Sequence, residues 1–166
     1  MAKLKKQHMT IHWKAIVQDD SSIPATEATL KEKATLVGRI GLMMLSVGTG
    51  AWRVRNLMNK VARCLGITCT ADIGLLAISY TCIEGTDTYT QSISNPTTGV
   101  NTHKLMQLEL FMKEFPDKVS TYSVKHIHEV LDEIQKLPAN YKAWNLGLAS
   151  ALACGAFTFL LGGGPV

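Results

Sequence analysis

Charged side chains are missing from the end of this chain. Residues 143–166 contain no Asp, Glu, Lys or Arg. Apart from the indole of Trp144, the polar side chains in this run are those of Asn145, Ser150 and Thr158. A helix needs about 20 predominantly apolar residues to cross a bilayer. We therefore expect residues 143–166 to form a transmembrane helix. The alternative is a buried helix of a soluble domain, which in a domain this small would usually carry a polar stripe.

The chain also lacks the patterns of several other protein classes. Its net charge of +4 is modest, and its lysines are scattered except near the start, so no basic stripe indicates a nucleic-acid partner. Nothing at the N-terminus resembles a secretion signal. The cysteines match neither zinc-site nor thioredoxin-type spacing, and we expect them to be reduced and to face the cytosol: Cys64, Cys69, Cys82 and Cys154.

Motifs for cofactor binding, metal binding and catalysis are absent as well. Gly48-x-Gly50 does not continue as a dinucleotide-binding loop, because Arg53 occupies the third glycine position and a helix precedes it. His126 and His128 lie two positions apart on a predicted helix, whereas a helical metal pair needs a spacing of about four. We expect a solvated His128 and a half-buried His126. No nucleophile elbow is present, so we predict no cofactor, no metal and no enzyme.

Periodicity and breaker residues indicate an α+β domain between a tail and the closing run. We expect a mobile tail over residues 1–26, a cytosolic domain over 27–142 and the first transmembrane helix over 143–166. Apolar residues recur at helical spacing in four segments, and β-branched residues alternate in between. The predicted order is α-α-β-β-α-α followed by one transmembrane helix, with helices over about 26–47, 54–65, 101–115 and 123–137 and the small antiparallel sheet within 67–94.

Arg53 is the first candidate for a substrate or gating role. It opens the second helix beside Trp52, directly after the flexible Gly48-x-Gly50 step, so its guanidinium could bind a carboxylate of a substrate. The structural alternative is an ion pair with an acidic residue such as Asp72 or Glu84. Both interpretations remain open from the sequence.

Asp72 is the second candidate, because it lies within the apolar stretch "ADIGLLAI". An unpaired buried carboxylate is costly. The side chain must therefore be paired, exposed at an edge or placed in a turn, and we expect a turn before Gly74.

Small residues recur within the closing run. Gly147, Ala151 and Gly155 lie four positions apart, which would form a face where another membrane helix could pack closely. Trp144 stands beside Lys142 at the near end, as residues at a membrane interface do. Lysines on that side predict that the domain lies in the cytoplasm.

Three motifs resemble the threonine/serine exporter family. The segment "SVGTGAWRVRNLMNKVARCLG" is similar to a motif of that family, and "PTTGVNTHKLMQLELFMKEF" and "LDEIQKLPANYKAWNLGLASALACGAFTFLLGGG" follow in the family's order. The resemblance covers about residues 30–166. The positions of the first motif that match are Gly48, Trp52, Arg53, Val54, Met58, Ala62 and Gly66. Gly50 and Arg55 depart from it, since the family often has Glu there.

The resemblance implies an N-terminal cytosolic domain followed by several membrane spans, in one chain or in two partner chains. Family members are associated with export of threonine and serine or of small dicarboxylates. We therefore expect this chain to be the domain plus the first span of a plasma-membrane exporter, truncated and unable to transport alone. Its partners would be further spans or a membrane subunit, with homo-oligomers an option. The alternative is a membrane-tethered regulatory or interaction domain without transport activity.

Overall fold

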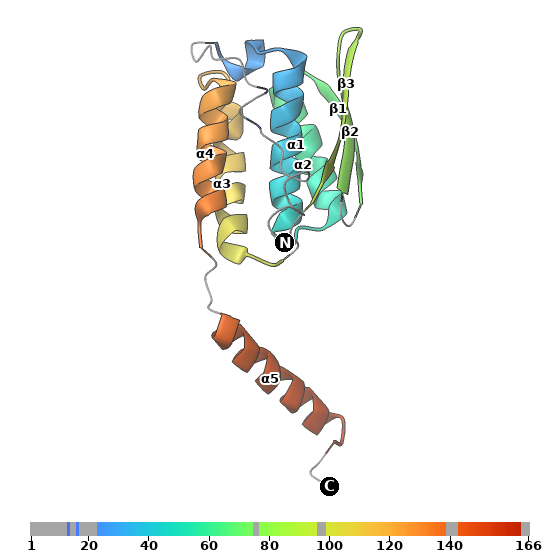
Figure 1. Ribbon diagram of the computed structural model, residues 1–166, viewed down its shortest axis with the longest axis vertical. Coiled ribbons are helices and arrows are strands. Elements are labelled where there is room, and N and C mark those ends of the chain that lie inside the picture. Colours follow the sequence, from blue (N-terminus) through green and yellow to red (C-terminus); the bar gives the residue numbers. More distant parts are fainter. Residues whose placement is uncertain are drawn as a thin grey trace, which may run out of the picture.

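The computed structural model describes Trp13, Ile16 and residues 23–74, 77–95, 99–138 and 143–163. Most of the tail predicted over residues 1–26 lies outside them. The described elements, in chain order, are the 3₁₀ helix η3 (Ala25–Glu27), α1 (Leu30–Ser46), α2 (Ala51–Cys64), β1 (Thr68–Ile73), β2 (Ala77–Glu84), β3 (Asp87–Ser94), α3 (Thr102–Lys118), α4 (Val124–Lys136) and α5 (Ala143–Leu160). Figure 1 shows α1 and α2 between the sheet and the α3–α4 pair.

The predicted order α-α-β-β-α-α is wrong, because the sheet has three strands between α2 and α3 where two were expected. The long β-branched stretch divides at Gly74, whose N–H donates to the Ala77 carbonyl at 2.9 Å. A second reversal at Gly85, with φ of 60°, turns β2 into β3. The result is an antiparallel meander in the order β1-β2-β3.

The sheet has one buried face and one polar face, as an antiparallel sheet packed on one side requires. Ile78, Tyr80 and Cys82 of β2 point toward the helices and are at most 2% exposed. On the outer face, the hydroxyls of Thr81 and Thr90 lie 2.9 Å apart in one of two cross-strand hydroxyl pairs. The inner face therefore supplies the contact with α1 and α2.

Helix α1 is the central element, since it contacts α2, α4 and two strands. Thr29 caps it in a capping box, in which Thr29 and Glu32 each bind the other's backbone N–H. The helix passes very close to the sheet at Gly38, where a Cβ would lie 2.7 Å from Cε1 of Tyr80. The buried Lys33 ammonium binds the Glu84 carboxylate of β2 at 2.5 Å.

Helices α3 and α4 form the layer on the other side of α1 (Figure 1). Asn101 caps α3, and Ser123 caps α4 by accepting a hydrogen bond from the His126 N–H. The helix expected over about 101–115 continues through Pro116 to Lys118. In the last turn Pro116 removes one helical hydrogen bond without preventing the final residues from keeping helical geometry.

The prediction of a transmembrane helix over residues 143–166 is wrong. Within the part of the chain that the structure describes, no helix has both the length and the apolar character that crossing a membrane requires. Helix α5 ends at Leu160, and Gly162 follows with φ of 86°. The helix is therefore shorter than the uncharged run over residues 143–166.

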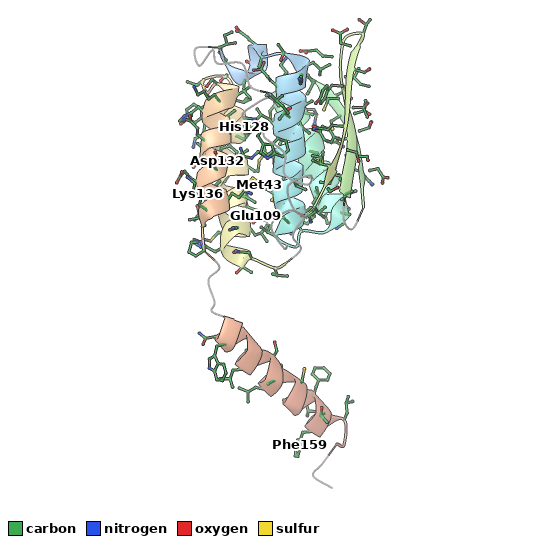
Figure 2. All side chains as sticks on the ribbon, viewed as in Figure 1. Met43, Glu109, His128, Asp132, Lys136 and Phe159 are labelled. Carbon is green, nitrogen blue, oxygen red and sulfur yellow. The ribbon has the colours of Figure 1, made fainter. Side chains whose placement is uncertain are left out.

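Helix α5 leads away from the rest of the molecule (Figure 1). Its large apolar side chains that the structure describes are exposed, including Leu152 and Phe157, each 67% exposed. Figure 2 shows Phe159 on this helix, apart from the labelled side chains of α1, α3 and α4. The predicted boundary at residue 142, like Lys142 itself, lies outside the described residues.

Candidate functional site

The turn between α1 and α2 forms the centre of the candidate site. Gly48 has φ of 92°, a conformation that favours glycine, and its N–H donates to the Leu45 carbonyl at 3.1 Å. A Cβ at Gly48 would lie 3.1 Å from Cγ2 of Val100, in the loop that precedes α3. The Asn101 N–H donates to the Val47 carbonyl at 3.3 Å, which joins that loop to the turn. Glycine is thus required both by the backbone and by the close approach.

Helix α2 begins directly after this turn and presents Trp52 and Arg53 at its first residues. Trp52 is 67% exposed. Arg53 Nη2 donates to Glu109 Oε1 of α3 at 2.9 Å, and both side chains are about half exposed, at 53% and 48%. A pair this exposed contributes at most about 1 kcal/mol to stability. The structure therefore brings Gly48, Trp52 and Arg53 together at one end of the domain.

The prediction that Arg53 pairs with Asp72 or Glu84 is wrong. Glu109 binds Arg53, while Glu84 binds Lys33. Asp72 does not lie in a turn but in β1, opposite Ser79 and exposed on the outer face of the sheet. An exposed carboxylate needs no buried partner, which explains how the apolar stretch accommodates Asp72.

Two buried polar side chains, Thr49 in the turn between α1 and α2 and Asn95 after β3, lack hydrogen-bond partners in the described structure. Thr49 is 6% exposed and Asn95, the residue after β3, is 4% exposed. The Thr49 hydroxyl and both amide atoms of Asn95 lack a partner among the described residues. Buried polar atoms usually bind protein or ordered water. These atoms can therefore bind water or a small polar molecule.

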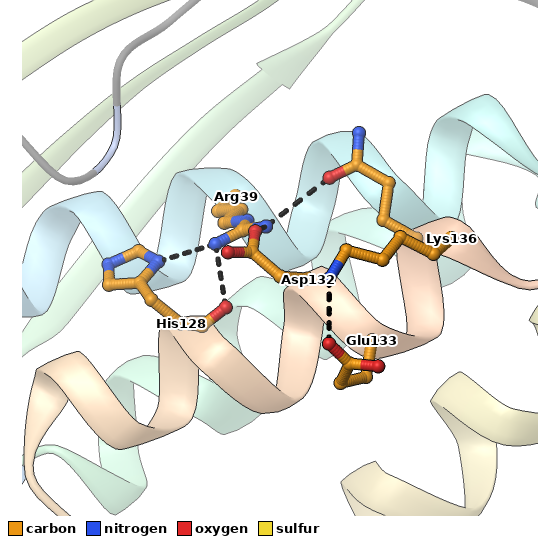
Figure 3. A network of polar contacts seen from close by, with 6 residues as sticks. Arg39, His128, Asp132, Glu133 and Lys136 are labelled. Atoms are coloured by element: carbon orange, nitrogen blue, oxygen red, sulfur yellow. Dashed lines mark hydrogen bonds and ion pairs between the residues drawn. The ribbon is translucent and has the colours of Figure 1, made fainter.

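A buried polar network, which the sequence analysis did not identify, connects α1 to α4. Arg39 is 2% exposed, and its Nη1 donates to the His128 carbonyl and lies 3.0 Å from His128 Nδ1. Its Nη2 binds the Asp132 carboxylate and, at 3.2 Å, Gln135 Oε1. Figure 3 shows these side chains converging on Arg39. Trp13 covers the network, with its ring 5.9 Å from Arg39 Cζ and 6.2 Å from the imidazole centroid.

The predicted environments of the two histidines are reversed. His128 is 1% exposed, whereas the His126 side chain is 51% exposed. Burial, together with the Arg39 charge, lowers the pKa of His128 to about 3, against a weaker opposing effect of Asp132. Arg39 can only donate, so His128 Nδ1 must accept and the imidazole is neutral. The network is thus a fixed structural connection between two helices.

The sequence contains a pattern that indicates the burial of His128, one member of this network. Val124, Ile127, His128 and Leu131 recur at the three- and four-residue spacing of a buried helical face, and all four are buried. The spacing places His128 on the apolar stripe. Its partner Arg39 lies 89 residues away in sequence, so no local pattern connects the two.

Metal binding has no support in the described residues, because no group of three or more His, Cys, Asp or Glu side chains there could hold an ion. Helix α5 presents its small residues to solvent, since a Cβ at Gly147 or Gly155 would meet no atom within 4 Å. Trp144, Gly147, Leu148 and Ala151 line a shallow apolar groove on this helix.

The comparisons with known proteins place the chain in a class of membrane transport proteins. The ThrE family model, described as "Putative threonine/serine exporter", matches residues 35–166. The match spans most of the chain, so this protein belongs to the threonine/serine exporter family. No curated protein and no solved structure matches it. Membership in an exporter family implies a location at a membrane and describes a transporter rather than an enzyme.

Proposed function

We propose that this chain acts in the export of threonine and serine across the plasma membrane. The observation that supports the proposal is the family match over residues 35–166, which begins within α1 and includes the whole candidate site. Small dicarboxylates are the alternative substrates. The family description favours the two amino acids. We assign the chain no catalytic residue.

We assign the substrate or gating role to the end of the domain that carries Gly48, Trp52 and Arg53. Helices α2 and α3 both begin at this end, and unsatisfied N–H groups at helix N-termini favour anions. Among the described residues, the Arg53 guanidinium is paired with Glu109, and both side chains are about half exposed. A carboxylate of a substrate or of a neighbouring segment can therefore replace Glu109 at low cost. Asp72 lies away from this pair, on the outer face of the sheet, and we give it no part in the proposed role.

The proposed location of the domain is the cytoplasmic side of the membrane. The four cysteines are free, as is usual for proteins in a reducing compartment. The proposed partners are further membrane segments, in this chain or in a membrane subunit, with a homo-oligomer as an option. The small residues Gly147, Ala151 and Gly155 of α5 would let a partner helix approach closely, because nothing described covers Gly147 or Gly155.

Efflux from intact cells tests the proposal. Cells with the native gene intact, deleted or restored are loaded with threonine- or serine-containing dipeptides, and the amino acids that appear outside are measured over time. We expect deletion to slow threonine and serine efflux and restoration to recover it. Succinate efflux, measured in the same cells, tests the dicarboxylate alternative. Unchanged efflux of both amino acids on deletion would contradict the proposed function.

A further inference from the structure

Two free cysteines face each other across the inner face of the sheet. Cys69 of β1 and Cys82 of β2 are direct register partners, and both are free cysteines. Directly opposite residues in an antiparallel pair have Cα atoms about 4.5–5.5 Å apart, within the range of about 4.4–6.8 Å that disulfides span. The backbone is therefore already placed for a bond between the two sulfur atoms.

The two thiols differ in how they can be reached. Cys69 is 6% exposed and lines a cleft of about 490 Å³ between α2 and the start of β1. Cys82 is fully buried. The other residues that line the cleft are Asn56, Asn59, Arg63, Ile67 and Thr68. A small molecule in the cleft can therefore meet Cys69 first.

The pKa values of the two thiols are also shifted in opposite directions. The accessible thiol, Cys69, is the one whose pKa is lowered. Interaction with the neighbouring Cys82 thiol lowers the pKa of the Cys69 thiol, against the opposing effect of burial. The interaction with Cys69, together with burial, raises the pKa of Cys82. The thiolate is the attacking form of cysteine. Arg63 adds a positive charge to the cleft, which favours an anionic reagent.

We propose that Cys69 and Cys82 are a site of reversible thiol–disulfide exchange with a small disulfide such as oxidised glutathione. The Cys69 thiolate attacks one sulfur of that disulfide, forms a mixed disulfide and releases one glutathione thiolate. Cys82 then gives up its proton and attacks Cys69 Sγ, which releases the second glutathione. The protein loses two protons and two electrons, and the small disulfide gains them as it becomes two glutathione thiols.

The bond would covalently join β1 to β2 beside the C-terminal end of α2. A cross-link between two positions of the chain restricts the unfolded state and so stabilises the folded one. The oxidised domain is therefore expected to unfold at a higher temperature than the reduced domain. This modification does not depend on the proposed role in export.

Peptide mapping tests the proposal on the whole chain. Cys154 on α5 is exposed, so the experiment uses a Cys154→Ser background to prevent cross-links between molecules. The folded protein is incubated with oxidised glutathione, quenched in acid, alkylated and digested with chymotrypsin. Cleavage after Leu65 and Tyr80 places Cys64, Cys69 and Cys82 in three separate peptides.

We expect the intact mass to fall by two hydrogen atoms and the map to show a Cys69–Cys82 linked peptide. Cys82→Ala should stop at a glutathione adduct on Cys69, whereas Cys69→Ala should leave Cys82 as a thiol. The matched control, Cys64→Ala, should still form the bond. If Cys82→Ala does not fold, the peptide map of the Cys154→Ser protein decides the test by itself. The proposal is overturned if that map shows Cys69 and Cys82 both still alkylated, or Cys69 linked to Cys64.

Discussion

The neutral state of His128 predicts that acid destabilises the fold through one identified side chain. The native pKa of His128 is about 3, whereas an unperturbed histidine side chain has a pKa of about 6.5. Because the native pKa is depressed, the His128 imidazole binds a proton in the unfolded chain at pH values where it stays neutral in the folded chain. The stabilising effect is therefore complete above about pH 6.5 and is lost progressively as the pH falls toward 3.

The magnitude at moderate acidity follows from the two pKa values. At about pH 5 the unfolded imidazole is almost fully protonated and the native one is almost fully neutral, which costs the fold about 2 kcal/mol. The loss arises because an imidazolium would lose its hydrogen bond from Arg39 and face a second buried cation.

The assay compares urea unfolding of the wild-type chain and His128→Asn by circular dichroism at about pH 8 and pH 5. The Asn side-chain oxygen can accept the Arg39 hydrogen bond but does not titrate. We expect the wild-type chain to lose about 2 kcal/mol more than the variant between the two pH values. An equal loss in both proteins would refute the reasoning, because His128 would then titrate alike in the folded and unfolded chains.

Two further substitutions test the packing of α1 against the sheet. Gly38→Ala should lower the free energy of unfolding by about 1–3 kcal/mol in urea titrations, because its Cβ would overlap the Tyr80 ring; wild-type stability would contradict that contact. Glu84→Gln should cost about 1–3 kcal/mol in the same assay, because Lys33 is buried, although Glu84 itself is 39% exposed. Glu133→Gln, in an exposed pair, should cost less than about 0.5 kcal/mol, and equal losses for the two Glu variants would contradict the role of burial.

Elements with a regular local pattern could be predicted from the sequence. Helix α2 has apolar residues at three- and four-residue spacing and ends before Gly66, whose φ of 73° suits a helix C-terminus. The turn at Gly85 between β2 and β3 follows from "EGTD" between two β-branched runs. In each case the signal lies within a few residues of the feature.

Features set by distant parts of the chain could not be predicted in the same way. The partner of Arg53 is Glu109 on α3, 56 residues away, and nothing near Arg53 in the sequence indicates it. Arg39 is buried because helices and strands surround α1, although arginine is usually exposed. The closing run misled the prediction because its uncharged length exceeds that of helix α5.

The most direct test of the account is the initial rate of threonine efflux from cells whose deleted gene is restored with an Arg53→Gln variant. Lys60→Gln, an exposed charge on the same helix α2, is the control, and both proteins are compared with wild type at equal abundance. The account predicts that Arg53→Gln lowers efflux at least tenfold more than Lys60→Gln, an effect of about 1.4 kcal/mol, with unfolding stability changed by less than about 1 kcal/mol. Equal efflux with the two variants would contradict the assignment of the export site to this end of the domain.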